Sequence, residues 1–378
     1  MLFIKIDWSS DMENLYMPAR VIYGKNAVRE NAAVLKELGG SCLIVTGGSS
    51  AKKSGALDDV QSALESVNIK YAVFDRISAN PLLSVCHEAG EEARKIDADF
   101  ILGIGGGSAL DSAKAIAIFA ANPGLAPADI YKRVYDNAPL KVALVGTTAG
   151  TGSEVTGVSV LTNDETGRKK SISGADCYAA VSLCDYTYTC SMPYDITVST
   201  ALDAFAHAVE GYFTPKATGI IDLWAEKCIP EIYNALCFMY ETKTVPDEKL
   251  RDSLYKGSLY AGLVINTCGT AFPHPLGYVL TENYGVPHGK ACAAFFKAFF
   301  ERAQKFAPVK AEKLCSLCGA ESYEIIEVIS SLADIHIKIS EEDAENYSLR
   351  WAESVPKNFI SSPGSLTREE AKEILASL

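Results

Sequence analysis

The sequence lacks several features that would each place it in a distinct class of proteins. No stretch of its 378 residues approaches the ~20 consecutive apolar residues that a membrane-spanning helix needs. It has no long basic run, and its formal net charge of −12 argues against nucleic acid and anionic membranes as partners. Its 11 cysteines are scattered without the spacing of a disulfide scaffold, which is expected in a reducing compartment.

A leader segment is also not expected. The apolar run at residues 1–8 is too short for a signal peptide. With no basic face and no span, the sequence predicts a cytoplasmic protein that binds neither membrane nor nucleic acid.

The length predicts about two domains, and the pattern of apolar residues changes near residue 192. Before that point, short apolar runs alternate with helical patterns at 51–66 and 81–95, which predicts an α/β domain with a doubly wound, mostly parallel sheet over 1–192. After it, apolar residues recur at helical spacing, which predicts an all-α domain over 193–378. The expected strands are 42–46, 70–74, 100–104, 141–145 and 179–184, and the expected helices are 199–212, 220–240, 249–264, 291–306, 323–332 and 367–378.

Histidine is scarce, and three of the five histidines fall in one pattern with an aspartate. Asp203 and His207 are four residues apart, so on a helix they share one face. His274 and His288 follow 14 residues apart. Any one of them could be an ordinary packed side chain, but the four together predict a metal site. Three imidazoles and a carboxylate suit Fe²⁺, Zn²⁺ or Ni²⁺ and do not suit Ca²⁺ or Mg²⁺.

Two turns in the first half have the composition of phosphate-binding loops. Residues Gly105, Gly106, Gly107 and Ser108 lead from an expected strand into a helix, where free backbone N–H groups can hold a pyrophosphate. The Rossmann fingerprint G-x-G-x-x-G fails, because Ser108 stands where its last glycine would be. Asp111, in the first turn of that helix, is expected to cap or orient the phosphate turn rather than react.

The second turn also follows a strand. It offers glycines and hydroxyl groups that suit the ribose and nicotinamide side of a dinucleotide. Each turn alone could be a structural loop, but two at the carboxyl ends of strands in one sheet predict a bound dinucleotide. The hydroxyl-bearing residues of this turn are Thr147, Thr148, Thr151 and Ser153.

A third turn bears on which dinucleotide binds. Gly47 stands where an acidic residue would repel a 2′-phosphate, and it is followed by Gly48, Ser49 and Lys52. Space, hydroxyl groups and positive charge at this point favour NADP(H) over NAD(H). The alternative is that the lysine belongs to an ordinary solvated helix face.

Together these motifs resemble the iron-containing (group III) alcohol dehydrogenases, in particular the branch that uses NADP(H) to reduce aldehydes. The motifs that carry the resemblance are Gly105–Lys114, Thr147–Val155, Asp203–His207 and Gly285–Gly289. The resemblance implies a dehydroquinate synthase-like architecture with a nucleotide domain, a helical metal domain and a cleft between them. It implies Asp203, His207, His274 and His288 as the metal ligands and Fe²⁺ as the ion, with Zn²⁺ or Ni²⁺ as alternatives. It also implies a homo-oligomer, a dimer or larger.

Two further residues take their expected roles from the resemblance. Lys169 matches a lysine that the family places beside the cofactor, although Lys170 is a rival for that role. Many members carry a histidine four residues after the third ligand, where this chain has Tyr278. Tyr278, a ribose hydroxyl or a water chain could replace that histidine as a proton relay.

The sequence therefore predicts a metal-dependent alcohol dehydrogenase or aldehyde reductase that transfers hydride between NADP(H) and a small primary alcohol or aldehyde. One alternative is an NAD-dependent polyol or glycerol-type dehydrogenase. A second is a dehydroquinate synthase-like lyase. The lyase is disfavoured because a site for a phosphorylated sugar acid should be rich in Lys and Arg, whereas residues 272–290 contain only Lys290.

Overall fold

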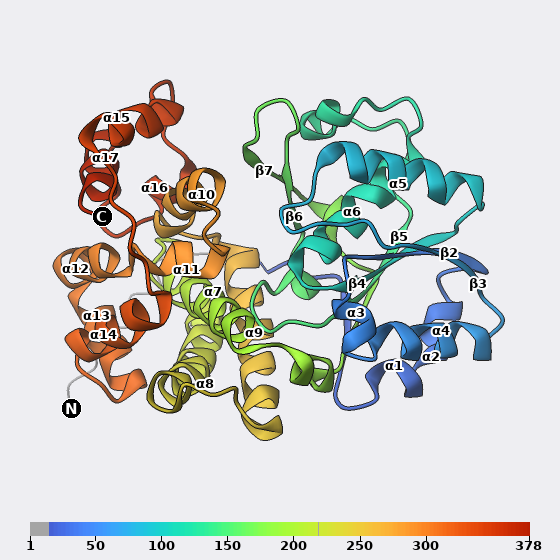
Figure 1. Ribbon diagram of the computed structural model, residues 1–378, viewed down its shortest axis with the longest axis horizontal. Coiled ribbons are helices and arrows are strands. Elements are labelled where there is room, and N and C mark those ends of the chain that lie inside the picture. The colour runs from blue at the N-terminus through green and yellow to red at the C-terminus, as the bar shows by residue number, and fades with distance from the viewer. Residues whose placement is uncertain (1–14, 218) are drawn as a thin grey trace, which may run out of the picture.

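The computed structural model describes residues 15–217 and 219–378, so the apolar run at 1–8 lies outside the described residues. Its first half contains a parallel six-stranded sheet with the order β1-β8-β5-β4-β2-β3, which confirms the predicted sheet (Figure 1). Non-consecutive neighbours in this order require crossover connections, and helices provide them. The strands are β1 (Arg20–Tyr23), β2 (Ser41–Thr46), β3 (Lys70–Phe74), β4 (Phe100–Gly105), β5 (Lys141–Gly146) and β8 (Val181–Cys184).

Helices cover both faces of this sheet, because its strands are apolar on both sides. Along β2, Leu43 and Val45 pack in one core with helices α5 (Leu83–Lys95) and α6 (Gly107–Ala121). Cys42 and Ile44 pack in a second core with helices α2 (Ala32–Lys36) and α4 (Ala56–Ser66). Strand β2 therefore contributes side chains to two hydrophobic cores. The helices of this half are α1 (Ala27–Glu30), α2 (Ala32–Lys36), α3 (Ser50–Lys53), α4 (Ala56–Ser66), α5 (Leu83–Lys95) and α6 (Gly107–Ala121).

The second half is helical, as predicted, and a third core lies mainly within it. Among the described residues, no helix has both the length and the apolar character needed to cross a membrane. The boundary at 192/193 stays a prediction; β8 ends at Cys184 and α7 begins at Tyr194. The helices are α7 (Tyr194–Tyr212), α8 (Gly219–Thr242), α9 (Glu248–Cys268), α10 (Pro273–Tyr284), α11 (His288–Ala293), α12 (Phe296–Phe306), α13 (Pro308–Cys318), α14 (Ser322–Ala333), α15 (Glu341–Ser348), α16 (Lys357–Ile360) and α17 (Arg368–Ala376).

Some elements differ from the sequence prediction. The helix expected at 51–66 is two helices, because Gly55 between them has φ +82°, a conformation that glycine tolerates. The helix expected at 291–306 is likewise two, α11 and α12. The sequence prediction missed β1 and the antiparallel hairpin of β6 (Val158–Thr162) and β7 (Lys169–Ser173). These short strands are partly exposed, so their apolar pattern is weak.

Helix α7 is buried along most of its length, and α11 lies directly against it. This contact depends on Gly289, because a Cβ atom there would be 1.8 Å from the Ser199 carbonyl oxygen and 2.8 Å from the Asp203 amide nitrogen. Helix backbones can approach this closely only where a side chain is missing. The glycine therefore sets the distance between the helices that carry Asp203 and His288.

We expect Gly289→Ala to lower the free energy of unfolding by roughly 1–3 kcal/mol or more, because the added methyl group overpacks a closed contact. Urea unfolding followed by circular dichroism would measure the change. Gly124→Ala is the matched control, since a Cβ atom there would meet nothing within 4 Å. Equal stability of the two variants would contradict the proposed role of Gly289.

Candidate metal centre and nucleotide edge

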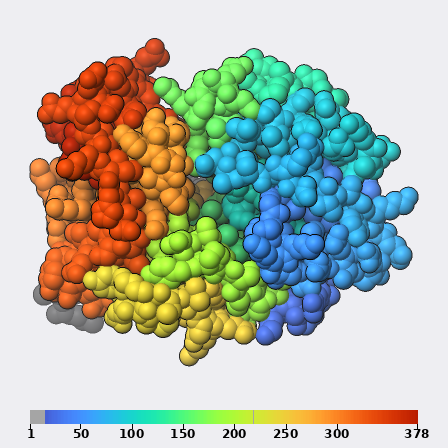
Figure 2. Space-filling model, in the orientation of Figure 1, coloured from blue at the N-terminus to red at the C-terminus, as the bar shows by residue number. Residues whose placement is uncertain are grey.

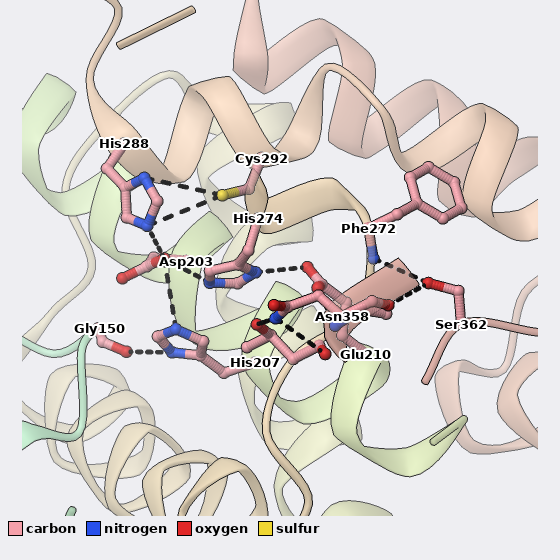
Figure 3. Close-up of polar contacts among 12 residues, drawn as sticks. Gly150, Asp203, His207, Glu210, Phe272, His274, His288, Cys292, Asn358 and Ser362 are labelled. Atoms are coloured by element: carbon pink, nitrogen blue, oxygen red, sulfur yellow. Dashed lines mark hydrogen bonds and ion pairs between the residues drawn. The ribbon is translucent and has the colours of Figure 1, made fainter. Parts of the chain in front are cut away.

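Four polar side chains from three helices converge on one point (Figure 3). Asp203 and His207 lie one turn apart on α7, His274 lies in the first turn of α10, and His288 begins α11. The Oδ1 atom of Asp203 is 3.7 Å from Nε2 of His207 and 3.8 Å from Nε2 of both His274 and His288. The structure therefore brings together all four residues that the sequence suggested as ligands.

The converging atoms fit a metal ion because of their spacing and because two of them have no hydrogen-bond partner. Donors about 2.1 Å from a single ion in tetrahedral geometry lie about 3.4 Å apart, close to the observed separations. Oδ1 of Asp203 and Nε2 of His274 are buried and have no hydrogen-bond partner among the described residues. Buried polar atoms are normally paired, so an unpaired acceptor between imidazole nitrogens indicates a site for a cation.

Two of the imidazole rings are held by their other nitrogen. Nδ1 of His207 lies 3.2 Å from the carbonyl oxygen of Gly150, and Nδ1 of His274 lies 2.8 Å from Oε1 of Glu210. These acceptors require the proton on Nδ1, which leaves the Nε2 lone pairs facing the centre. The sequence prediction missed Glu210, although its position seven residues after Asp203 puts it on the same face of α7.

Burial keeps two of the rings in the neutral form that binds metals. It lowers the pKa of His207 to about 4 and the pKa of His288 well below its ordinary value. For His274 burial also opposes the charged form, but the Glu210 carboxylate outweighs it and raises the pKa. Burial alone would raise the pKa of Asp203, whereas the positive charges near it, His274 and Lys169 among them, hold it below its usual value.

A cysteine that the sequence prediction did not include lies in the same place. The donor atoms of Asp203, His274, His288 and Cys292 all lie within 4.8 Å of one another. His207 is outside this compact group, although its distance to Asp203 is the shortest of the three imidazole distances. The two observations agree if His207 and Cys292 lie on opposite sides of the centre, as they do in Figure 3.

Tyr278 and Lys169 line one side of the centre. The Tyr278 ring stacks on His288, with centroids 5.2 Å apart and an interplanar angle of 18°, and Nζ of Lys169 lies 5.5 Å from the Tyr278 ring centroid. Burial lowers the pKa of Lys169. Lys170 instead lies over Tyr131, 4.5 Å from its ring centroid, so Lys169 is the lysine that faces the donors.

The first two glycine-rich turns lie side by side at the carboxyl ends of β4 and β5. The amide of Thr147 donates to the carbonyl of Gly105 at 2.9 Å. A Cβ atom at Gly107 would be 2.6 Å from Thr151, and one at Gly106 would be 3.0 Å from Thr148. The two turns therefore form one continuous, side-chain-poor edge at the start of α6, which begins at Gly107 and includes Ser108.

Asp111 and Ser153 bind each other rather than facing outward. Oγ of Ser153 donates to Asp111 at 2.6 Å, and the fully buried Nζ of Lys114 reaches both the hydroxyl and the carbonyl oxygen of Ser153. Lys114 also donates to the carbonyl oxygens of Thr156 and Val158. The expectation that Asp111 lies in the first turn of its helix is wrong, because α6 begins at Gly107 and its first turn contains no acidic residue. Asp111 accepts from the Ser153 hydroxyl and from the Val160 amide, and its role in orienting the phosphate turn stays a prediction.

Packing in the third turn explains why residue 47 is a glycine. A Cβ atom at Gly47 would be 2.3 Å from the carbonyl oxygen of Ile77, so any side chain there would clash with backbone. Gly48 follows with φ +47°, and the exposed Ser49 and Lys52 lie at the two ends of the short helix α3. The absence of an acidic residue at 47 therefore reflects packing and does not by itself identify the coenzyme.

Two family profiles match this chain. The profile described as "Iron-containing alcohol dehydrogenase" matches residues 18–186, and the one described as "Fe-containing alcohol dehydrogenase family, C-terminal" matches residues 197–353. This chain belongs to the iron-containing alcohol dehydrogenase family. The resemblance to this family is confirmed, while the resemblance to its NADP(H)-using branch stays a prediction. The chain is an oxidoreductase of a family that uses a metal and a nicotinamide cofactor.

Individual members of the family differ in substrate. The chain is 30% identical over 289 residues to the sulfoacetaldehyde reductase of Bilophila wadsworthia, covering 75% of this chain and 74% of that protein. It is 27% identical over 334 residues to the NADPH-dependent butanol dehydrogenase of Clostridium saccharobutylicum, covering 85% and 82%. A crystal structure of an iron-containing alcohol dehydrogenase from Thermotoga maritima superposes with a TM-score of 0.88 at 33% identity, covering 96% and 98%.

We expect Glu210→Gln to weaken Zn²⁺ binding about 10- to 100-fold, because the amide holds the His274 ring without the charge that makes it a stronger donor. Competition with a chromophoric chelator would measure the affinity. Glu226→Gln, a carboxylate removed from the partly buried contact with Tyr212 in the same half, is the control. Unchanged affinity in Glu210→Gln would contradict the proposed role of the Glu210 carboxylate in strengthening the His274 donor.

Proposed function

We propose that this protein is a metal-dependent alcohol dehydrogenase that works as an aldehyde reductase, transferring hydride between NADP(H) and a small primary alcohol or aldehyde. The observation that carries the proposal is the bond from His207 to Gly150. Gly150 belongs to the second glycine-rich turn and His207 to the donor cluster. A nucleotide on that turn and an ion in the cluster would therefore share one rigid contact.

The proposed ligands are Asp203, His207, His274 and His288. When bound, the divalent ion would polarise the substrate oxygen as a Lewis acid, and the nicotinamide would supply or accept the hydride. Fe²⁺ is the ion that the family favours, and Zn²⁺ or Ni²⁺ also suits these donors. The protein's own part is to hold the Nε2 atoms in place and to keep the site dry.

The surrounding residues would position the coenzyme and the substrate. Gly105, Gly106, Gly107 and Ser108 would hold the pyrophosphate through backbone N–H groups at the start of α6. Thr147, Thr148 and Thr151 would lie along the ribose and nicotinamide. Figure 2 shows the surface hollowed where the sheet half meets the helical half, which is where a small substrate would enter.

Lys169 and Tyr278 would form the wall beside the reacting groups. The stack of Tyr278 on His288 limits how that imidazole can turn, which gives the tyrosine a positioning role. Its role as a proton relay stays a prediction. Tyr278→Phe keeps the stack and removes the hydroxyl, so a large loss of turnover in that variant would support the relay.

The preference for NADP(H) is proposed from the third turn. Ser49 and Lys52 are exposed at the two ends of α3, beyond the carboxyl end of β2, where an adenosine 2′-phosphate would lie. Gly47 and Gly48 leave the approach open. The NAD-dependent polyol or glycerol-type dehydrogenase remains the second candidate, because Gly47 has a packing reason that is independent of the coenzyme.

The lyase alternative gains little support from the site. Residues 272–288 contain no Lys or Arg, and the described cation nearest the Tyr278 ring is Lys169. A phosphorylated sugar acid would need more positive charge than this. We also infer a homo-oligomer, because β1 is an edge strand whose other side is open to pairing in the described residues, and a cytoplasmic location stays a prediction. Light scattering after gel filtration would test the oligomer.

We expect oxidation of NADPH by short aldehydes to require the metal. Absorbance at the nicotinamide band would be followed with chelator-treated protein, with protein reloaded with Fe²⁺ or Zn²⁺, and with NADH in place of NADPH. Asp203→Ala and His288→Ala should lose most turnover together with stoichiometric metal. Near-normal turnover in either variant with metal retained would overturn the site, and consumption of neither coenzyme by loaded protein would favour the lyase.

We expect Ser49→Asp to lower kcat/KM for NADPH about 10- to 100-fold while changing that for NADH little. The introduced carboxylate would repel the 2′-phosphate and remove a hydroxyl contact, and a bond to a charged group is worth about 1.5–3 kcal/mol. Lys36→Asp, which adds a carboxylate on the exposed surface of α2, is the control. Equal losses for the two coenzymes would refute the proposed 2′-phosphate pocket.

A further inference from the structure

The thiol of Cys292 lies inside the donor cluster rather than beside it. Sγ is 3.8 Å from Nδ1 and 3.9 Å from Nε2 of His288, and Cys292 is fully buried. A sulfur about 2.3 Å and an imidazole nitrogen about 2.1 Å from one ion are about 3.8 Å apart at the angle of about 120° that two of five ligands can make. The observed distances are thus close to those of two ligands of one metal.

Two other atoms point to a ligand at the same place. Oδ1 of Asp203 and Nε2 of His274 are buried and unpartnered, and both belong with Cys292 to the group whose donor atoms lie within 4.8 Å of one another. The cysteine therefore does not stand alone. It shares its surroundings with two buried acceptor atoms that a single cation would satisfy together.

The sulfur of Cys292 is positioned by its helix in the same way as the carboxylate of Asp203. His288 and Cys292 are four residues apart on α11, as Asp203 and His207 are on α7, so each helix offers a pair of donors on one face. Gly277 on α10 makes room for the thiol, because a Cβ atom there would be 3.0 Å from both Sγ and the amide nitrogen of Cys292.

We propose that Cys292 is a fifth protein ligand of this metal centre, bound through sulfur when no substrate oxygen is present. The inference rests on the proposed metal site and adds to it a soft donor opposite His207. A coordinating thiol gives up its proton to solvent as the metal binds. Thiolate donors suit Zn²⁺ better than oxygen donors do, so Cys292 would bias the centre toward zinc.

X-ray absorption of the substrate-free, zinc-loaded protein is the direct test. We expect one sulfur scatterer at about 2.3 Å from zinc in the wild type. Cys292→Ser should lose that scatterer and keep the nitrogen and oxygen shell. Cys86→Ala, which removes an equally buried thiol in the sheet half, should keep it.

The wild-type spectrum decides the question even if Cys292→Ser fails to fold. A shell of nitrogen and oxygen alone, with zinc stoichiometric, overturns the role of Cys292 and leaves the proposed function standing. If His274→Ala binds zinc as tightly as the wild type, the ion lies elsewhere and the proposed metal site itself fails. Cobalt-loaded protein gives a second readout, because a thiolate-to-cobalt charge-transfer band should appear in the wild type and vanish in Cys292→Ser.

Discussion

The carboxylate of Asp203 is buried against three imidazole rings, and its Oδ1 atom accepts no hydrogen bond from the described residues. An anion in that position is costly unless a cation neutralises it. Three helices position the groups around this atom. Helix α7 places Asp203 in the core, and α10 and α11 bring His274 and His288 to it. Gly289 lets α11 approach α7 closely enough for this contact. A bound divalent ion would satisfy the carboxylate and the Nε2 lone pairs at once.

The edge formed by the two glycine-rich turns after β4 and β5 depends on a second buried charge, that of Lys114. Nζ of Lys114 donates to carbonyl oxygens of Ser153, Thr156 and Val158, and Asp111 accepts from Ser153. A buried ammonium surrounded by acceptors fixes the segment after β5 against α6, which carries both Lys114 and Asp111. The two turns can therefore keep a fixed backbone conformation although they have few side chains to hold them.

The two sites are joined by short, direct contacts. His207 bonds to Gly150 in the second glycine-rich turn. Glu154 lies just beyond that turn, and the hydroxyl of Tyr255 on α9 donates to it at 3.0 Å. On the other side, the amide of Lys169 donates to Glu282 on α10 at 2.9 Å. Hydride transfer needs a fixed distance between nicotinamide and substrate, and these contacts restrain the two halves on both sides of the hollow.

The sequence by itself determined the parallel sheet, the helical second half, the two glycine-rich turns and the four converging residues, because each of these leaves a local pattern. Apolar runs mark buried strands, glycines mark turns, and a four-residue spacing marks one helix face. Glu210, Lys114 and Cys292 were decided only by the tertiary structure. Their positions depend on which helices pack together and how closely, and that is set by contacts such as Gly289 against Ser199 and Gly277 against Cys292, between residues far apart in the chain. The same holds for Gly47, whose carbonyl neighbour comes from Ile77, thirty residues later.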